Sequence, residues 1–248
     1  MSHPEQVGFF RAVAGANSPV LARSAVLEIG SYDVNGTIRG IFCDSDRYVG
    51  VDLTEGPGVD HVGFGHEYHE ADGVFDVSIS GECFEHDQNW AATFTNMARL
   101  TRPGGLVAFS CASRGRPEHG TLRTDAELSP GTQAVGDDYY RNLTAADFER
   151  ALDLAALFGS WRFWYLPTHC DLYFAGVRKG TTPGRADAQL PRDEDIAQLR
   201  RLMPPVHRAA RLPLKAVART GVDERRFQDL TYRYWNLLLK VAGDGSTR

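Results

Sequence analysis

Two carboxylic acids and a histidine follow one short apolar segment of the chain. The segment Val74–Ser80 has the length and composition of a buried strand, and Glu82, Glu85 and His86 come after it. The carboxyl end of a strand in an α/β sheet is where ligands bind, and these groups could exchange protons there. We therefore take Glu82 and His86 as candidate bases. Alternatively, Glu85 and His86 only cap the helix that follows.

A second pattern predicts a bound ligand nearer the start of the chain. The stretch Val26–Arg39 begins as a buried strand, breaks at Gly30 and resumes after an Asn-Gly pair with residues that can open a helix. Such a unit binds ligands, because glycine lets the backbone approach closely and a helix N-terminus offers unpaired N–H groups. About twenty residues further on, another strand ends in Asp52, whose carboxylate can accept both hydroxyls of a ribose.

Three other classes of site lack their motifs in this sequence. A dinucleotide site needs G-x-G-x-x-G, but Tyr32 and Asp33 stand where glycines would be required. His66 and His69 are three residues apart rather than in an H-E-x-x-H pattern, so no zinc site is predicted there. The four cysteines show no C-x-x-C spacing. We therefore predict no metal site and no disulfide framework.

Length and charge narrow the class of protein. The chain has 248 residues, enough for one α/β core with an appendage, and a formal net charge of −5. An acidic chain is a poor partner for nucleic acid, because phosphate binding depends on Lys and Arg, and no electrostatic attraction to membranes is expected. Without a signal-peptide pattern or a run of membrane-spanning length, we expect a cytoplasmic location.

The remaining elements fit an α/β protein. Apolar residues at helical spacing predict helices over 4–14, 87–101, 193–203 and 223–241. Aromatic strands over 161–166 and 171–177 are joined by a link so short that they must pair antiparallel. Before them, after an apolar strand over 106–110, lies a long segment, 111–140, with little periodicity, which is typical of a lid or binding loop or of a disordered region.

In this order the motifs resemble those of class I S-adenosylmethionine-dependent methyltransferases. Glu28-Ile29-Gly30 resembles the acidic-x-Gly core of the first motif, Asp52 the acidic end of the second strand, and Pro103-Gly104-Gly105 the turn before the fifth strand. The resemblance implies a Rossmann-like seven-stranded sheet, mostly parallel with an antiparallel last strand, and helices on both faces. We expect residues 1–180 to form this domain and 181–248 a linker and C-terminal helical extension, serving as a cap or for dimerisation.

The resemblance also implies S-adenosyl-L-methionine as the cofactor. In this family an acidic residue often binds the adenine amino group, but the nearest match here is Phe64-Gly65, so we expect an apolar cover or a backbone contact. The expected cofactor-binding residues are Glu28, Gly30, Ser31, Asn35, Gly36, Asp52, Leu53, Phe64, Gly65, Ser80 and Gly81.

Part of the long segment resembles a subgroup of these enzymes from sugar and natural-product pathways. That subgroup carries a His-Gly pair followed by a Tyr-Tyr/Trp-Arg-x-Thr element, matched here by His119-Gly120 and 138–144. The resemblance implies methyl transfer to a hydroxyl of a small molecule, whose proton must be removed. We take His119 as the first candidate base, before Glu82 and His86, and Tyr139 as a group that orients the acceptor.

Two other functions remain open at this stage. The chain could methylate nitrogen on a small molecule or a protein side chain, or it could be a non-catalytic module that binds partners through its C-terminal helices. Nucleic-acid methylation is disfavoured further because the chain lacks an Asn/Asp-Pro-Pro-Tyr/Phe motif. The expected partners are thus a small-molecule acceptor and, if the C-terminal helices pair across a dimer, a second copy of the chain.

Overall fold

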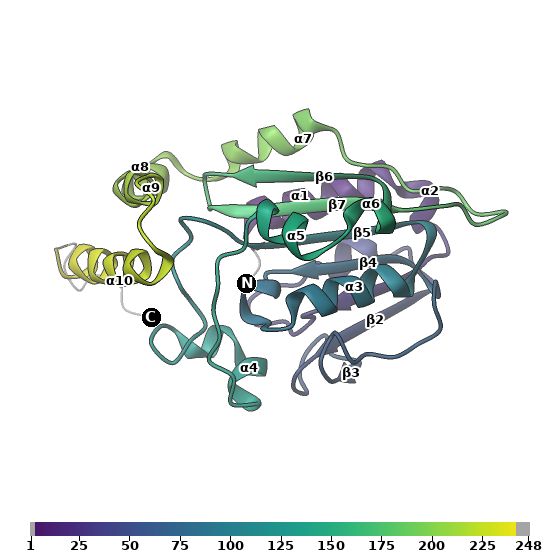
Figure 1. Cartoon of the computed structure of the whole chain (residues 1–248), viewed down its shortest axis with the longest axis horizontal. Coiled ribbons are helices and arrows are strands. Elements are labelled where there is room, and N and C mark those ends of the chain that lie inside the picture. The colour runs from purple at the N-terminus through teal and green to yellow at the C-terminus, as the bar shows by residue number, and fades with distance from the viewer. Residues whose placement is uncertain (1–2, 242–248) are drawn as a thin grey trace.

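The computed structural model describes residues 3–241, whose centre is a seven-stranded sheet of order β3-β2-β1-β4-β5-β7-β6 (Figure 1). The strands are β1 (Ala25–Ile29), β2 (Arg47–Asp52), β3 (His61–Val62), β4 (Phe75–Gly81), β5 (Thr101–Ala112), β6 (Phe158–Leu166) and β7 (Asp171–Arg178). Only β7 runs against its neighbours, and the other pairs in the described sheet are parallel. The predicted Rossmann-like sheet with an antiparallel last strand is confirmed.

Ten α-helices surround this sheet in the described part of the chain. They are α1 (Pro4–Ala16), α2 (Ser18–Leu21), α3 (Trp90–Leu100), α4 (Pro130–Ala134), α5 (Ala145–Ala151), α6 (Leu154–Leu157), α7 (Asp193–Gln198), α8 (Pro205–Ala210), α9 (Leu212–Arg219) and α10 (Glu224–Val241). Short 3₁₀ helices are η1 (Arg39–Phe42), η2 (Phe84–His86), η3 (Ala126–Leu128) and η4 (Leu199–Leu202). None of the described helices is long and apolar enough to span a bilayer.

Side chains of the strands alternate between two apolar layers, one on each face of the sheet. Leu27 and Phe109 belong to the layer under α3 and α5, where Phe109 stacks on Phe148 with ring centroids 4.7 Å apart. Val26 belongs to the opposite layer, with Phe9 of α1. Figure 1 shows α3 and α5 on one side of the sheet and α1 on the other. Burial on both faces explains why the central strands are continuous apolar runs.

The helix predicted after the first strand is absent. Residues 31–38 form a loop, and only the 3₁₀ helix η1 follows it. Asp33 Oδ1 accepts the backbone N–H of Gly36 at 2.7 Å, a local turn that competes with helix formation. In place of that helix, α1 covers this face, and its Phe10 meets Phe42 of η1 edge to face. The N–H groups expected from a helix terminus are therefore supplied by a loop.

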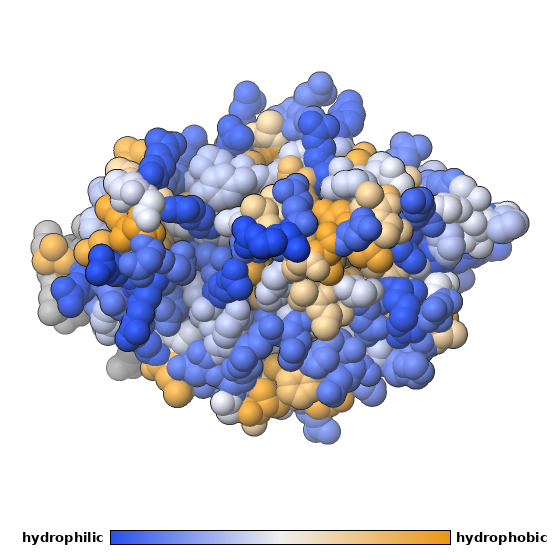
Figure 2. All heavy atoms as spheres, viewed as in Figure 1, coloured by the Kyte–Doolittle hydropathy of each residue, from blue (hydrophilic) through white to orange (hydrophobic). Residues whose placement is uncertain are grey.

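The C-terminal part packs in two portions. Ile196 and Leu199 join the apolar layer of α1, as their predicted helical stripe requires. Further along, Phe227 of α10 forms a small separate cluster with Leu214 and Ala218. The apolar spacing that predicted the last helix included Leu230 on its buried face. That position was wrong, because the Leu230 side chain is 46% exposed. Figure 2 shows apolar residues over α8 and α9, and Leu212 at the start of α9 is 62% exposed.

Candidate functional site

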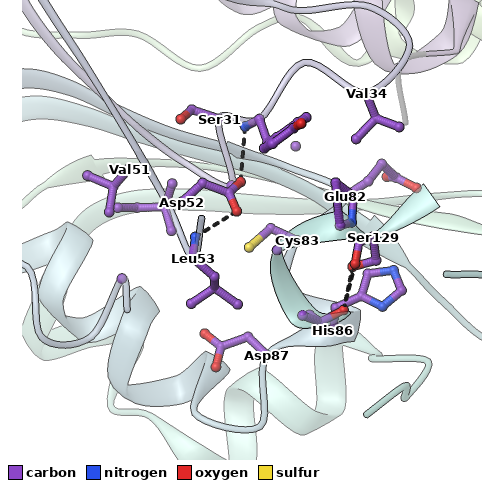
Figure 3. Close-up of a pocket in the computed structure, with 18 of the residues that line it drawn as sticks. Ser31, Val34, Val51, Asp52, Leu53, Glu82, Cys83, His86, Asp87 and Ser129 are labelled. Carbon is purple, nitrogen blue, oxygen red and sulfur yellow. Dashed lines mark hydrogen bonds between the residues drawn. The ribbon is translucent and has the colours of Figure 1, made fainter. Parts of the chain in front are cut away.

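A cavity opens at the carboxyl edge of the parallel strands, on the side where α4 and α10 lie in Figure 1. Its walls come from the loop after β1, the end of β2, the turn after β4, and the long segment between β5 and α5. Figure 3 shows one or more residues of each wall around it, namely Ser31, Asp52, Glu82, His86 and Ser129. This is the edge at which α/β sheets bind ligands, as the sequence predicted.

Gly30 brings the first wall close to the turn after β4. Its N–H donates to the Val51 carbonyl at 2.9 Å, and its φ of +79° lies in the left-handed region. A Cβ built there would lie 2.6 Å from the Cβ of Cys83. Both the conformation and the space therefore require glycine, and a side chain would push the two loops apart.

Asp52 is held at the end of β2 by backbone donors. Its Oδ2 accepts the N–H of Tyr32 at 3.0 Å and its Oδ1 accepts the N–H of Leu53 at 2.7 Å (Figure 3). Burial raises the pKa of Asp52, and these two hydrogen bonds oppose that rise. Because a carboxylate oxygen can accept more than one hydrogen bond, each oxygen keeps capacity for a ligand hydroxyl.

Glu28 lies behind this wall with a partner of its own. The Tyr48 hydroxyl donates to Glu28 Oε2 at 2.6 Å. Burial raises the pKa of Glu28 to about 8, with the Tyr48 hydrogen bond opposing the shift. The side chain therefore carries no charge at neutral pH and serves as a hydrogen-bonding group.

The long segment between β5 and α5, residues 113–143, forms the outer wall; we call it the cover segment. Its Ser129, Pro130, Gly131 and Thr132 line the cavity. A Cβ on Gly131 would lie 2.5 Å from Asp52 Oδ1, so this backbone lies directly over the carboxylate. The segment contains α4 and η3, and it lies where a binding loop would lie.

The turn after β4 holds its residues in an unusual conformation. Glu82 has a φ of +52°, which costs a non-glycine residue about 1–3 kcal/mol. Its N–H donates to the Ser110 carbonyl at 2.9 Å, and its carboxylate lies 3.7 Å from Arg116. Burial raises the pKa of Glu82, and the nearby Asp171 adds to the rise. Backbone strain of this kind concentrates at ligand sites.

Glu85, His86 and His119 form a group that we call the open cluster. Glu85 is fully buried, and its Oε1 lies 3.9 Å from His119 Nε2. The rings of His86 and His119 meet edge to face with centroids 5.2 Å apart, and both line the cavity. Burial lowers the pKa of His86 to about 4 and that of His119 well below its usual range, so both rings are neutral. Glu85 lies behind them.

Tyr140 contacts the open cluster, whereas the sequence pointed to Tyr139. The Tyr140 ring packs against His86 and His119 with centroids 5.4 Å and 5.2 Å away. Its hydroxyl lies 3.1 Å from the Pro117 carbonyl. Tyr139 does not line the cavity. Two adjacent tyrosines in an irregular segment give no periodicity from which to tell the inward one.

A second buried group, the paired cluster, lies beside the first and consists of His3, Glu5, Arg116, His169 and Asp171. Arg116 Nη1 lies 3.0 Å from one Asp171 oxygen, and His3 Nε2 lies 2.9 Å from the other. His169 Nδ1 lies 3.2 Å from Glu5. Burial alone would raise the pKa of Asp171. The neighbouring Arg116 and His3 outweigh that effect and hold the pKa below its usual value, so this carboxylate is ionised.

Most of the predicted site residues come together at the cavity. Those that line it are Glu28, Gly30, Ser31, Gly36, Asp52, Leu53, Phe64, Gly65, Gly81, Glu82, His86 and His119. Asn35, Ser80 and Tyr139 are not among the lining residues. Sequence reasoning also missed Gln6 of α1, whose Nε2 donates to Ser110 Oγ at 3.3 Å at the cavity wall. Nothing local in its helix distinguishes Gln6 from a surface residue.

Comparison with known proteins identifies the class of domain. A family model described as a methyltransferase domain matches residues 43–109, a span that includes Asp52 and the turn after β4. S-adenosylmethionine is the cofactor that such a domain uses. A search of the curated proteins finds no match to this sequence.

Solved structures share the fold at low sequence identity. The YcgJ protein of Bacillus subtilis has a TM-score of 0.52 and 14% identity, covering 72% of this chain and 100% of that one. A 1,6-didemethyltoxoflavin-N1-methyltransferase of Burkholderia thailandensis, solved with S-adenosylhomocysteine, has a TM-score of 0.48 and 16% identity, covering 70% and 79%. The N-methyltransferase NodS of Bradyrhizobium japonicum, solved with the same product, has a TM-score of 0.45 and 14% identity, covering 71% and 86%.

Proposed function

Because residues 43–109 match a methyltransferase domain, we propose that the chain is an S-adenosylmethionine-dependent methyltransferase that methylates a hydroxyl group of a small molecule such as a sugar or a natural product. A sulfonium methyl is already activated, so the protein has two tasks. It must align the acceptor oxygen with the methyl group, and it must provide a group that takes the hydroxyl proton. The cavity supplies candidates for both.

In this proposal the cofactor lies along the wall formed by β1 and β2. Its ribose hydroxyls bind Asp52, whose oxygens each accept one backbone N–H and keep further capacity. Leu53 and Phe64 cover the adenine as apolar neighbours. The methionine portion lies at Gly30 and beside Gln6, whose buried Oε1 has no hydrogen-bond partner among the described residues and can accept from an ammonium group.

The open cluster is the observation that carries the choice of a hydroxyl acceptor. His86 and His119 present imidazole rings to the cavity, with Glu85 behind them. An alcohol gives up its proton far less readily than an ammonium group, so an O-methyltransferase needs such a group near the acceptor oxygen. His119 is the first candidate to receive that proton, since it reaches the cavity from the cover segment.

The C-terminal helices fit the proposed role of a cap. Asn142 Nδ2 in the cover segment donates to Glu224 Oε1 at 2.7 Å, and Gln228 Nε2 donates to the Arg116 carbonyl at 2.9 Å. Both bonds join α10 to the segment that covers the cavity. We therefore propose that residues 181–248, of which 242–248 lie outside the described residues, hold the cover segment in place.

The proposal is tested with radiolabelled S-adenosylmethionine and matched pairs of acceptors. Each pair has the same carbon skeleton and carries either a hydroxyl or an amine at the same position, such as a sugar and its amino sugar. We expect label on the hydroxyl member, with mass spectrometry placing the methyl group on oxygen. Transfer only to the amine members would replace the proposal with N-methylation. Cofactor binding without transfer to any member would indicate a binding module.

A further inference from the structure

We propose that Glu85, His86 and His119 hold a divalent transition-metal cation at the acceptor end of the cavity. Each of these residues offers one ligand atom, and the three atoms lie within 4.8 Å of one another. Two imidazoles with one carboxylate are a ligand set that zinc and ferrous iron both accept. The sequence predicted no metal site, because His119 is far from the other two donors along the chain.

The distances leave room for a cation after a small closure. Bonds of about 2.0–2.2 Å to zinc place tetrahedral ligand atoms about 3.4 Å apart. Ligand atoms that lie within 4.8 Å of one another therefore need to approach by about 1.4 Å at most. His119 lies on the cover segment, outside the sheet, so that closure requires no movement of a strand.

Unpartnered buried atoms point to a missing ligand here. Both carboxylate oxygens of Glu85 and Nδ1 of His86 are buried, and none has a hydrogen-bond partner among the described residues. A buried polar group without a partner costs about 1–3 kcal/mol, so native structures rarely keep several of them together. One cation would satisfy these atoms together.

An outer hydrogen bond orients the ring of His119 as a metal ligand requires. His119 Nδ1 lies 3.1 Å from the Pro117 carbonyl, which can only accept, so Nδ1 carries the proton. Nε2 then presents its lone pair toward Glu85. Metal-bound histidines commonly donate their other ring N–H to a backbone carbonyl in this way.

The local charge also favours a cation. Glu82, Glu85 and Asp171 are all buried within this region, and Arg116 is the guanidinium that faces them. Arg116 is already engaged with Asp171 at 3.0 Å, whereas it lies 3.7 Å from Glu82. Glu85 thus has no guanidinium within ion-pair distance in the described part of the chain, and a bound metal ion would stabilise its ionised form.

A cation at this position would change how the acceptor is activated, an inference that rests on the proposed O-methylation. His86 and His119 line the cavity, so a coordination position left by three protein ligands would face the acceptor. A bound metal ion lowers the pKa of a hydroxyl that coordinates it. The two histidines would then act as ligands, and the acceptor oxygen would be activated by the cation.

The test is a titration of the full chain, stripped with a chelator, with Co²⁺ and no acceptor present. Tightly held Co²⁺ gives visible absorption bands whose intensity reports its coordination, and Zn²⁺ is then added to displace it. We expect one Co²⁺ per chain, and weakening of its binding by about 100-fold or more in Glu85→Gln and in His119→Gln. Circular dichroism and S-adenosylhomocysteine binding confirm that both variants are folded.

His169→Gln is the matched control, because it removes an imidazole from the paired cluster, where His3, His169 and Asp171 form a second group of close donors. It should leave the Co²⁺ spectrum unchanged. No Co²⁺ bands with the wild-type chain, or bands lost in His169→Gln and kept in Glu85→Gln, would overturn the inference.

The metal titration and the methyl-transfer assay test the two proposals separately, so that either proposal can be rejected while the other is kept. Methyl transfer to a hydroxyl that persists after chelation, together with no Co²⁺ binding, would reject the metal site and keep the proposed function. One bound Co²⁺ lost in Glu85→Gln, together with transfer only to amines, would keep the metal site and reject O-methylation.

Discussion

The two buried histidine–carboxylate clusters lie side by side, yet their contacts differ. In the paired cluster, both oxygens of Asp171 have charged partners at 2.9–3.0 Å, and Glu5 Oε2 accepts from Thr168 at 2.7 Å, although Glu5 Oε1 has no hydrogen-bond partner among the described residues. None of the side chains of the paired cluster lines the cavity. In the open cluster, the Glu85 carboxylate has no hydrogen-bond partner among the described residues, and His119 Nε2 is 3.9 Å away. Burial alone therefore does not identify a functional site. Buried groups with unfilled hydrogen-bonding capacity beside a cavity do.

From this difference we propose that the paired cluster maintains the fold and the open cluster serves the proposed reaction. Ionised groups that satisfy one another gain nothing from a ligand, but losing one partner leaves a buried charge. Neutral rings that face the cavity contribute little to the fold, and they are free to receive a proton or a cation. Substitutions in the two clusters should separate stability from turnover.

The largest effect on stability is expected for Arg116→Met, which leaves Asp171 and Glu82 without their guanidinium. Breaking a buried pair in this way costs about 3–5 kcal/mol in the free energy of unfolding. Urea denaturation followed by circular dichroism measures the loss. Arg123→Met is the control, because Arg123 pairs with Glu118 and Asp229 at the surface and should cost less than about 1 kcal/mol. Equal stability of the two variants would contradict the structural role.

The largest effect on turnover is expected for His119→Ala. Loss of a group that receives the acceptor proton should lower kcat by about two to four orders of magnitude. Affinity for S-adenosylhomocysteine should stay nearly unchanged, because His119 is outside the proposed cofactor contacts. Steady-state kinetics and calorimetry together give both numbers. Wild-type turnover in this variant would exclude His119 from the reaction.

A smaller effect, dependent on pH, is expected for Glu28→Gln. Burial raises the pKa of Glu28 to about 8 from 4.5, so its contribution to stability is complete below pH 4.5 and is lost as the pH rises to 8. Glutamine does not titrate and keeps an oxygen for the Tyr48 hydroxyl. The variant should therefore gain stability relative to the wild type between pH 5 and pH 8, by up to a few kcal/mol. Thermal melts of both proteins at four pH values measure this. A difference in Tm that stays the same at every pH would contradict the raised pKa of Glu28.

The smallest effect is expected for Gly131→Ala, which disturbs the cover segment over Asp52 without touching either cluster. The added Cβ would lie 2.5 Å from Asp52 Oδ1. Overpacking of this kind costs about 1–3 kcal/mol, so cofactor affinity should fall about tenfold or more while the fold stays intact. Gly40→Ala is the control, since no atom lies within 4 Å of the added Cβ. Equal affinities would mean that the cover segment leaves Asp52 accessible.

The strands, and the cavity wall at the ends of β1 and β2, could be predicted from the sequence because the residue patterns that indicate them are local. Buried strands appear as apolar runs, and Gly30 and Asp52 stand directly at the ends of two of them. The antiparallel pair β6–β7 followed from a link too short for a crossover. The helix expected after Gly36 failed because Asp33 forms a local turn that composition alone did not reveal.

The two clusters could not be predicted in the same way. Arg116 meets Asp171 across 55 positions of sequence, and its partners lie on separate strands and loops. Which of Tyr139 and Tyr140 points inward depends on how the cover segment folds back onto Glu85, where the Arg141 N–H donates to the Glu85 carbonyl at 2.8 Å. Contacts between residues so far apart in the chain leave no periodic pattern in the sequence from which they could be predicted.

The most direct test of this account is calorimetric titration of S-adenosylhomocysteine into the wild-type chain and into Asp52→Ala. We expect one product molecule to bind per wild-type chain, and no measurable binding to the variant, while circular dichroism shows the same fold in both. Equal affinities in the two proteins would contradict the assignment of Asp52 to the ribose, and with it the position of the acceptor beside the open cluster.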